Sequence, residues 1–248
     1  MISIATLIAG FAVRQDSYSF MFNPKVGEKI RYKLEMTNEQ GLPALPPDTE
    51  TFSIFKVAGV KDGKFTVHQF TETVKKGEKP ISTLIGSFRV DSLMNSEMIL
   101  NPEAGSFDLM KSMISELSGC FFINYSKEPM KINEPFQVPV DVPALIKKYS
   151  TENDTDNVMS RSSGEGEKTI TLLRADDKSA DFLSSFRLGM KFQDTKDAAS
   201  TMNCTFEAKV TIDRGTCLPS KIENKAVVDM AAGVTNQKIS FNVRLNRV

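Results

Sequence analysis

The chain has 248 residues and equal numbers of basic and acidic side chains, 31 of each, so its formal net charge is zero. This balance argues against a nucleic-acid partner, because binding to phosphate backbones needs a concentrated basic face. The single histidine, His68, excludes a multi-histidine metal site, and the three cysteines form no C-x-x-C pair. We therefore expect no catalytic, metal or cofactor site of those kinds.

The N-terminal run Met1–Val13 contains no charged residue, and the first charge is Arg14. It is too short to cross a bilayer as a helix, which needs about 20 residues, so we expect no integral membrane span. The run fits the apolar core of a secretory signal that ends in the small residues of Gly10-Phe11-Ala12, although no basic residue precedes it. We expect residues 1–12 to be a clipped signal within a leader of residues 1–17, which predicts a periplasmic or extracellular protein. If the run is instead a native strand, the prediction is a cytoplasmic protein.

Most of the remaining chain alternates in polarity with a period of two, which is typical of antiparallel strands with one wet face. The segment "KIRYKLEM" (Lys29–Met36) shows this pattern, as does "QKISFNVRL" (Gln237–Leu245) near the C-terminus. Asp62-Gly63 and Asp213-Arg214-Gly215 predict tight hairpin turns between such strands. The count of roughly ten strands predicts a mainly β (α+β) fold, a large curled antiparallel sheet or half-barrel.

Helices are predicted at two places only. "SFDLMKSMISELSG" (Ser106–Gly119) has apolar residues at helical spacing, and Pro143 suits the first turn of a short helix in "DVPALIKKYS". The polar stretch "STENDTDNVMSRSSGEGEK" (Ser150–Lys168) has the composition of a loop. Its "ENDTDN" lacks the glycine and the final glutamate of a calcium loop, and its "SSGEGEK" lacks the elements of a phosphate cradle.

An internal repeat is indicated by three segment pairs that keep their order along the chain. "KVGEKIRYKL" aligns with "KINEPFQVPV", the hairpin that ends at Phe65 aligns with the one that ends at Phe182, and "FRVDSLMN" aligns with "FEAKVTID". We therefore expect a single β-rich domain over residues 18–248, with two similar halves at 18–125 and 126–248.

The twelve methionines gather partly between Leu93 and Met113, and such soft side chains suit surfaces that accept variable apolar partners. The competing interpretation is ordinary core packing. The functional interpretation is an enclosed apolar cavity on the concave side of the sheet. Its expected ligand-binding residues are Met94, Met98, Met110, Met113 and Leu117. His68 is expected to be a packed or rim residue.

The strand "VGEKIRYKL" and the turn-and-return hairpin "VTIDRGTCLPSKIENKAVV" are features of uncharacterised secreted bacterial β-rich families. Over residues 20–248 the chain resembles these families, which are similar in turn to the lipoprotein-carrier half-barrels of the cell envelope. The resemblance implies a curved sheet wrapped around helix, with an apolar concave face that holds acyl chains in the carriers. It transfers no individual functional residue.

The leading hypothesis is a non-catalytic exported envelope protein that binds an apolar or amphipathic, lipid-like ligand in the concave face of the sheet. The alternative is a structural or protein–protein interaction domain of the cell envelope, which predicts an exposed apolar patch or an uncovered edge strand. A third hypothesis is a carboxylate-based hydrolase, which needs two acidic side chains about 5–10 Å apart in a cleft.

Overall fold

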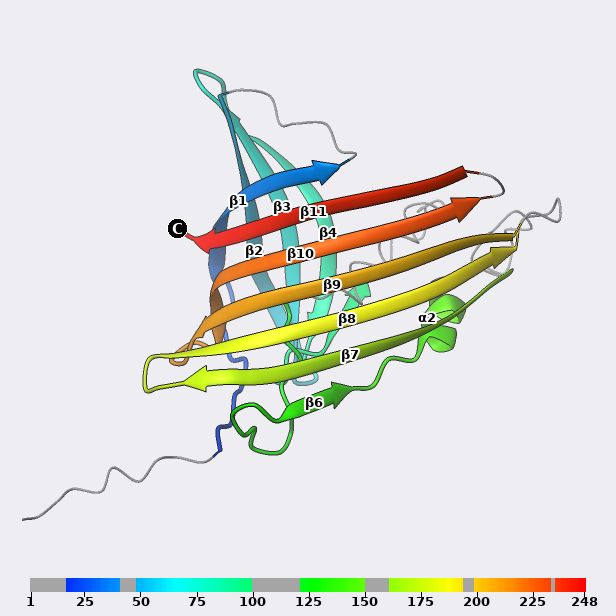
Figure 1. Cartoon of the computed structure of the whole chain (residues 1–248). Coiled ribbons are helices and arrows are strands. Elements are labelled where there is room, and N and C mark those ends of the chain that lie inside the picture. The colour runs from blue at the N-terminus through cyan, green and yellow to red at the C-terminus, as the bar shows by residue number, and fades with distance from the viewer. Residues whose placement is uncertain (1–16, 41–47, 100–120, 150–160, 194–198, 233–234) are drawn as a thin grey trace, which may run out of the picture.

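Segments that alternate in polarity form eleven strands of one open antiparallel sheet, as the computed structural model shows (Figure 1). The structure describes residues 17–40, 48–99, 121–149, 161–193, 199–232 and 235–248. Within these ranges the sheet is accompanied by one short helix. The predicted fold class, a large curled antiparallel sheet with short helical elements, is confirmed.

The strands follow the order of the chain in two runs. They are β1 (Lys29–Gln40), β2 (Thr49–Lys61), β3 (Lys64–Lys75), β4 (Ile81–Val90), β5 (Ser96–Ile99), β6 (Pro135–Val138), β7 (Ser162–Ala175), β8 (Ser179–Gln193), β9 (Ala199–Asp213), β10 (Leu218–Ala232) and β11 (Thr235–Arg247). The helix α2 (Val142–Tyr149) is the one predicted around Pro143, whereas the helix predicted at 106–119 lies outside the described residues.

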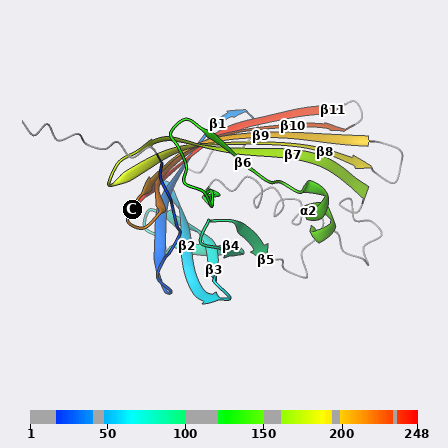
Figure 2. The same cartoon turned by 90° about the horizontal axis from the view of Figure 1, so that it is seen from below.

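The order of strands in the sheet is β5-β4-β3-β2-β1-β11-β10-β9-β8-β7-β6. Each run is a meander of neighbouring strands, and the first and last strands of the chain join the two meanders at the middle of the sheet. Leu34 of β1 lies opposite Leu245 of β11, and Tyr32 lies opposite Arg247. The sheet curls, so that β2–β5 face the layer formed by β7–β11 (Figure 2).

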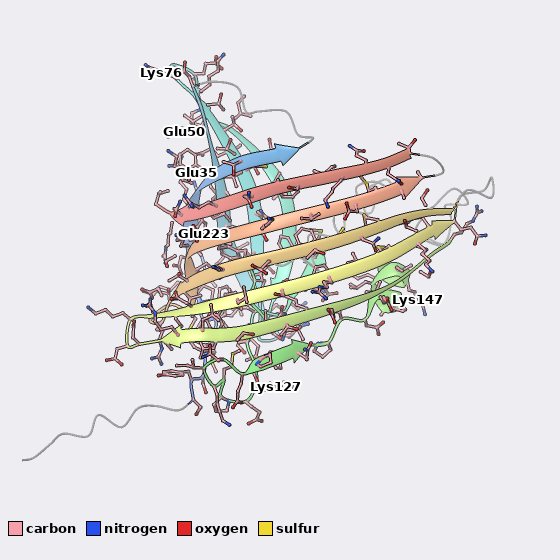
Figure 3. The ribbon with its side chains drawn as sticks, viewed as in Figure 1. Glu35, Glu50, Lys76, Lys127, Lys147 and Glu223 are labelled. Carbon is pink, nitrogen blue, oxygen red and sulfur yellow. The ribbon has the colours of Figure 1, made fainter. Side chains whose placement is uncertain are left out.

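Alternation separates an apolar inner face from a charged outer face. Along β8 every second residue is buried, including Phe182, Phe186 and Leu188. The outer face carries charged side chains, among them Glu35 and Glu223 (Figure 3). The period-two pattern in the sequence therefore indicates which residues face the core.

Two non-strand segments cover the inner face with aromatic rings. Phe20 and Phe22 come from the segment before β1, and Phe121 and Phe122 come from the segment before β6. Phe121 stacks on Phe55 of β2 with ring centroids 3.6 Å apart. These rings pack between the two facing parts of the curled sheet, since Phe20 also contacts Phe182 of β8 with ring centroids 5.0 Å apart.

Two buried tyrosines form hydrogen bonds from this core to the β9–β10 turn and to the start of β10. The Tyr32 hydroxyl donates to the carbonyl oxygen of Pro219 at 2.7 Å, and the Tyr125 hydroxyl donates to that of Cys217 at 3.1 Å. Burial raises the pKa of both phenols above their usual range, so both hydroxyls keep their proton and act as donors. The predicted turn at Asp213-Arg214-Gly215 is present between β9 and β10, and its positive φ falls at Cys217.

The two halves begin with the same local structure. Lys25–Glu28 before β1 and Lys131–Glu134 before β6 are both turns, in which Gly27 (φ 87°) and Asn133 (φ 63°) hold the third position in the left-handed region. Glycine and asparagine tolerate that conformation best. The aligned segments "KVGEKIRYKL" and "KINEPFQVPV" thus occupy corresponding places, while a gene duplication stays a prediction.

The loop predicted for the whole of Ser150–Lys168 is wrong for its second part, because β7 begins at Ser162. The glycines there serve close packing. A Cβ placed on Gly164 would lie 2.7 Å from the carbonyl oxygen of Gly189 and 3.1 Å from Val142, and one on Gly166 would lie 3.1 Å from Val142. The start of β7 has the polar composition of a loop, but it is a strand whose inner face packs against α2. "ENDTDN" lies outside the described residues.

Substituting Tyr32→Phe should lower the free energy of unfolding by about 1–3 kcal/mol, because the Pro219 carbonyl loses its buried donor. Tyr18→Phe is the matched control, since no hydrogen bond is described for the hydroxyl of Tyr18 and its ring remains over Arg214. Urea denaturation monitored by circular dichroism measures both variants. Equal effects of the two substitutions would contradict the assigned role of the Tyr32 hydroxyl.

Substituting Gly164→Ala should destabilise the protein by about 1–3 kcal/mol, because the added methyl group meets a backbone oxygen that cannot move away easily. Gly59→Ala, also in a strand, meets no atom within 4 Å and should change stability by about 0.5 kcal/mol or less. Thermal melting of the two variants compares them directly. A neutral Gly164→Ala variant would show that α2 does not need the glycine surface.

Candidate functional site

A groove of about 560 Å³ lies between the end of the first meander and the helix of the second. Its residues come from the turn before β5 and from β5, from the 121–125 segment, from the β6–α2 connection and α2, and from β7. They are Asn95, Ser96, Glu97, Asn124, Val138, Pro139, Val140, Asp141, Ala144, Leu145, Lys148 and Lys168. The groove therefore joins parts of the chain that are distant in sequence.

The β5 wall is held by a turn centred on Asp91. One carboxylate oxygen of Asp91 accepts hydrogen bonds from the backbone N–H groups of Leu93 and Asn95, both at 2.9 Å. The Asn95 side chain in turn accepts from the amide of Asn124 at 2.9 Å. The amide oxygen of Asn124 is buried and accepts no hydrogen bond from the residues that the structure describes, so this wall carries an acceptor without a partner among them.

The opposite wall is the start of α2 and the chain leading into it. Asp141 caps the helix, because its carboxylate accepts from the backbone N–H of Ala144 at 2.9 Å. Val142 and Ile146 point into the core, which leaves Ala144 and Leu145 on the side of the groove. Val138, Pro139 and Val140 continue this apolar wall toward β6.

Charged groups from both walls and from β7 also line the groove. The Lys148 ammonium is 3.7 Å from the Glu97 carboxylate, so this ion pair spans the two walls. Lys168 of β7 is 4% exposed and contributes to the floor. The groove thus combines an apolar wall with two ammonium groups and two carboxylates, the helix cap Asp141 and the Glu97 that pairs with Lys148 across the groove.

Of the predicted ligand-binding residues, the two that the structure describes, Met94 and Met98, do not line the groove. Met94 is fully buried and Met98 is 7% exposed, and both pack in the main core with Phe88 and Phe122. The residues between them, Asn95–Glu97, line the groove. Met110, Met113 and Leu117 lie outside the described residues. The groove opens to solvent, so it differs from the enclosed cavity that the sequence suggested.

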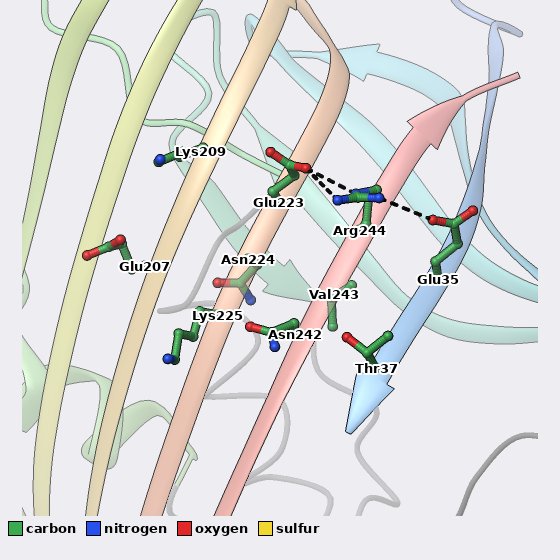
Figure 4. Close-up of a pocket in the computed structure, with 10 residues that line it drawn as sticks. All are labelled: Glu35, Thr37, Glu207, Lys209, Glu223, Asn224, Lys225, Asn242, Val243 and Arg244. Atoms are coloured by element: carbon green, nitrogen blue, oxygen red, sulfur yellow. Dashed lines mark hydrogen bonds and ion pairs between the residues drawn. The ribbon is translucent and has the colours of Figure 1, made fainter. Parts of the chain in front are cut away.

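A second hollow, of about 430 Å³, lies on the outer face of the sheet across β1, β11, β10 and β9 (Figure 4). Arg244 is its central group, 3.0 Å from Glu223 and 3.9 Å from Glu35. A hydrogen bond from Lys221, and the Arg244 guanidinium, hold the pKa of Glu223 below its usual value. An ionised carboxylate of this kind suits cross-strand ion pairing, whereas a general acid needs a raised pKa.

His68 lies on β3 opposite Ser87 of β4, and its Nδ1 is 2.7 Å from the serine oxygen. A serine nucleophile also needs a group that orients the imidazole and donors for an oxyanion. Among the residues that the structure describes, no carboxylate accepts a hydrogen bond from His68 or forms an ion pair with it. The pair matches the expected rim position.

Within the described ranges no three His, Cys, Asp or Glu side chains gather in a manner that could hold a metal ion. In the same part of the chain no helix is long and apolar enough to cross a membrane.

No protein-family model matches the chain, and no curated protein matches it. Among solved structures, three engineered mutants of the porin from Rhodopseudomonas blastica each align with 87% of this chain and 97% of their own chains. Their identities are 9%, 10% and 9%, with TM-scores of 0.20, 0.21 and 0.21. A likeness at this level carries no argument about fold or function.

The thiol of Cys204 should be unreactive in the folded protein. Burial raises its pKa to about 11, with a smaller contribution from Asp229. Only about one thousandth of such a thiol is ionised at pH 8, and the thiolate is the reactive form. Iodoacetamide labelling at pH 8 followed by peptide mapping should leave Cys204 unmodified in the native protein and modify it in urea. Rapid native labelling of Cys204 would contradict its placement in the core.

Proposed function

We propose that the chain is a non-catalytic, exported protein of the cell envelope that binds an amphipathic, lipid-like ligand in the groove between β5 and α2. The apolar part of the ligand lies along Val138–Val140 and the exposed side of α2. Its polar end lies near Lys148 and Glu97. Export rests on the apolar run at residues 1–12 alone, which lies outside the described residues.

The observation that carries this proposal is the pairing of chemistry and size in one groove. Its volume of about 560 Å³ falls within the range of roughly 300–1,000 Å³ typical of small-molecule sites. An apolar wall beside a few charged groups is complementary to a molecule that has a chain and a polar head. The hollow on the outer face is lined instead mainly by charged and polar side chains, of which Arg244 already pairs with Glu223 and Glu35.

The location of the groove also supports the proposal. It lies between β5, at one edge of the curled sheet, and α2, and its walls are fixed from behind by the core and by the Asp91 turn and Asp141 cap. A preformed groove loses little conformational entropy when a ligand binds.

A tryptophan placed in the groove should report binding, because the chain contains none. Ala144→Trp lines the groove, and Lys147→Trp lies on an exposed position of the same helix that does not. Titration with palmitate below its micellar concentration should shift the emission of Ala144→Trp to shorter wavelength, with saturation, and leave that of Lys147→Trp unchanged. Equal responses from the two reporters, or none, would overturn the proposal.

A charge in the apolar wall should weaken binding without harming the helix. Ala144→Glu lies in the first turn of α2, where an acidic residue is favourable for the helix dipole. It should raise the dissociation constant for palmitate by about tenfold or more, since the carboxylate must be desolvated against the ligand chain. Native mass spectrometry measures the bound fraction, and Lys147→Glu, with wild-type binding expected, controls for the change of charge.

A further inference from the structure

The two walls of the groove between β5 and α2 differ in polarity. The β6–α2 connection and the first turns of the helix contribute the apolar wall, formed by Val138, Pro139, Val140, Ala144 and Leu145. The facing wall comes from the turn before β5, from β5 and from the 121–125 segment, and all its side chains are polar: Asn95, Ser96, Glu97 and Asn124. A molecule that lies in the groove therefore meets apolar groups on one side and polar groups on the other.

The polar wall has hydrogen-bonding capacity that the protein leaves unused. Ser96 is half-buried, and its hydroxyl has no hydrogen-bond partner among the residues that the structure describes. The Asn124 amide donates to Asn95 at 2.9 Å, whereas its oxygen lacks a donor in the same part of the chain. The Glu97 carboxylate lies 3.7 Å from the Lys148 ammonium, which is too long for a hydrogen bond. This wall thus offers one hydroxyl and further oxygens that can accept.

A plain acyl chain is an incomplete match for such a groove. It would pack well against the apolar wall, but it would also cover Ser96 and Asn124 without supplying a partner to either. Polar groups that lose water and gain no hydrogen bond cost free energy. A ligand with hydroxyl groups on the side that faces β5 avoids this cost and keeps the apolar contact.

Hydrogen bonds hold the polar wall in one arrangement. The second carboxylate oxygen of Asp91 accepts from the side-chain amide of Asn95 at 2.9 Å, so the Asn95 oxygen is turned toward Asn124. The Tyr125 N–H donates to the carbonyl oxygen of Leu93 at 2.7 Å, which joins the 121–125 segment to the same turn. Polar groups at fixed positions favour a rigid ligand whose own polar groups are fixed, because neither side then loses much conformational entropy.

We propose that the groove binds a facial amphiphile, a rigid molecule with an apolar side against α2 and hydroxyl groups along the side that faces β5. This inference rests on the proposed function and narrows its ligand to hydroxylated, polycyclic amphiphiles with an acidic group near Lys148. The volume of about 560 Å³ is within the range of roughly 300–1,000 Å³ for such small-molecule sites. Palmitate, which uses only the apolar wall and the charged groups, is then a weaker ligand.

Cholate and cholanate test the inference as a matched pair of probes. They share the ring system and the carboxylate, and only cholate carries hydroxyl groups, all on one face. Ser96→Val should raise the dissociation constant for cholate by about fivefold or more and lower that for cholanate, because it turns a polar position of the wall into an apolar one. Native mass spectrometry below the micellar concentrations measures both ligands.

Two further variants separate the hydroxyl from bulk and from general effects. Ser96→Ala adds no atoms to the groove and should weaken cholate binding by a similar factor. Thr205→Val, at an exposed strand position of the outer face, should bind both ligands like the wild type. Far-ultraviolet circular dichroism verifies that each variant keeps the sheet.

The outcomes distinguish this inference from the proposed function. If both Ser96 variants keep the wild-type ratio of the two dissociation constants, or if the wild type binds cholanate but not cholate, the facial amphiphile is refuted and ligand binding in the groove stands. If palmitate, cholanate and cholate all fail to bind the wild type, the proposed function itself fails. Opposite responses of the two ligands to Ser96→Val support the inference, because damage to the groove would weaken both.

Discussion

Stacking of aromatic rings between the sheet and the segments before β1 and β6 is the contact on which the rest of this structure depends. A sheet of eleven strands with a single described helix has no second sheet to cover its apolar face, and Phe121 against Phe55 supplies that cover. The Tyr32 and Tyr125 hydroxyls then tie the covered face to the β9–β10 turn. The groove exists because this packing fixes β5 at a set distance from α2.

Much of the fold could be predicted because alternation is a local property. The Lys29–Met36 segment is part of a strand, as expected. Asp62-Gly63 forms the predicted tight turn between β2 and β3, with positive φ at both residues. The β7 start was missed, since two glycines and two glutamates have the composition of a loop. Their use becomes visible only when Val142 is placed against Gly164 and Gly166. At the start of β7 the amino-acid composition favours a loop, whereas packing against α2 stabilises a strand.

The candidate site was predictable only in outline. The methionines pointed to the right region, because Met94 and Met98 flank the residues that line the groove. The facing wall around Ala144 and Lys148 could not be found, since nothing in the sequence indicates that α2 would lie opposite β5. The outer face shows the converse: a chain of zero net charge arranges its charges in cross-strand pairs such as Arg187 with Glu167, which leaves no concentrated field for a charged partner on the described strands there.

The pairing of β1 with β11 has a consequence for how the chain is made. β1 is synthesised long before β11, so the first meander must wait with one side of β1 unpaired until β11 is available. Such non-local pairing slows folding and leaves a strand edge open to association in the meantime. The alternating charges of Arg31, Lys33 and Glu35 along that waiting strand keep its outer face soluble during this interval. The eleven-strand sheet is therefore continuous only once the thirteen-residue strand β11 pairs with β1.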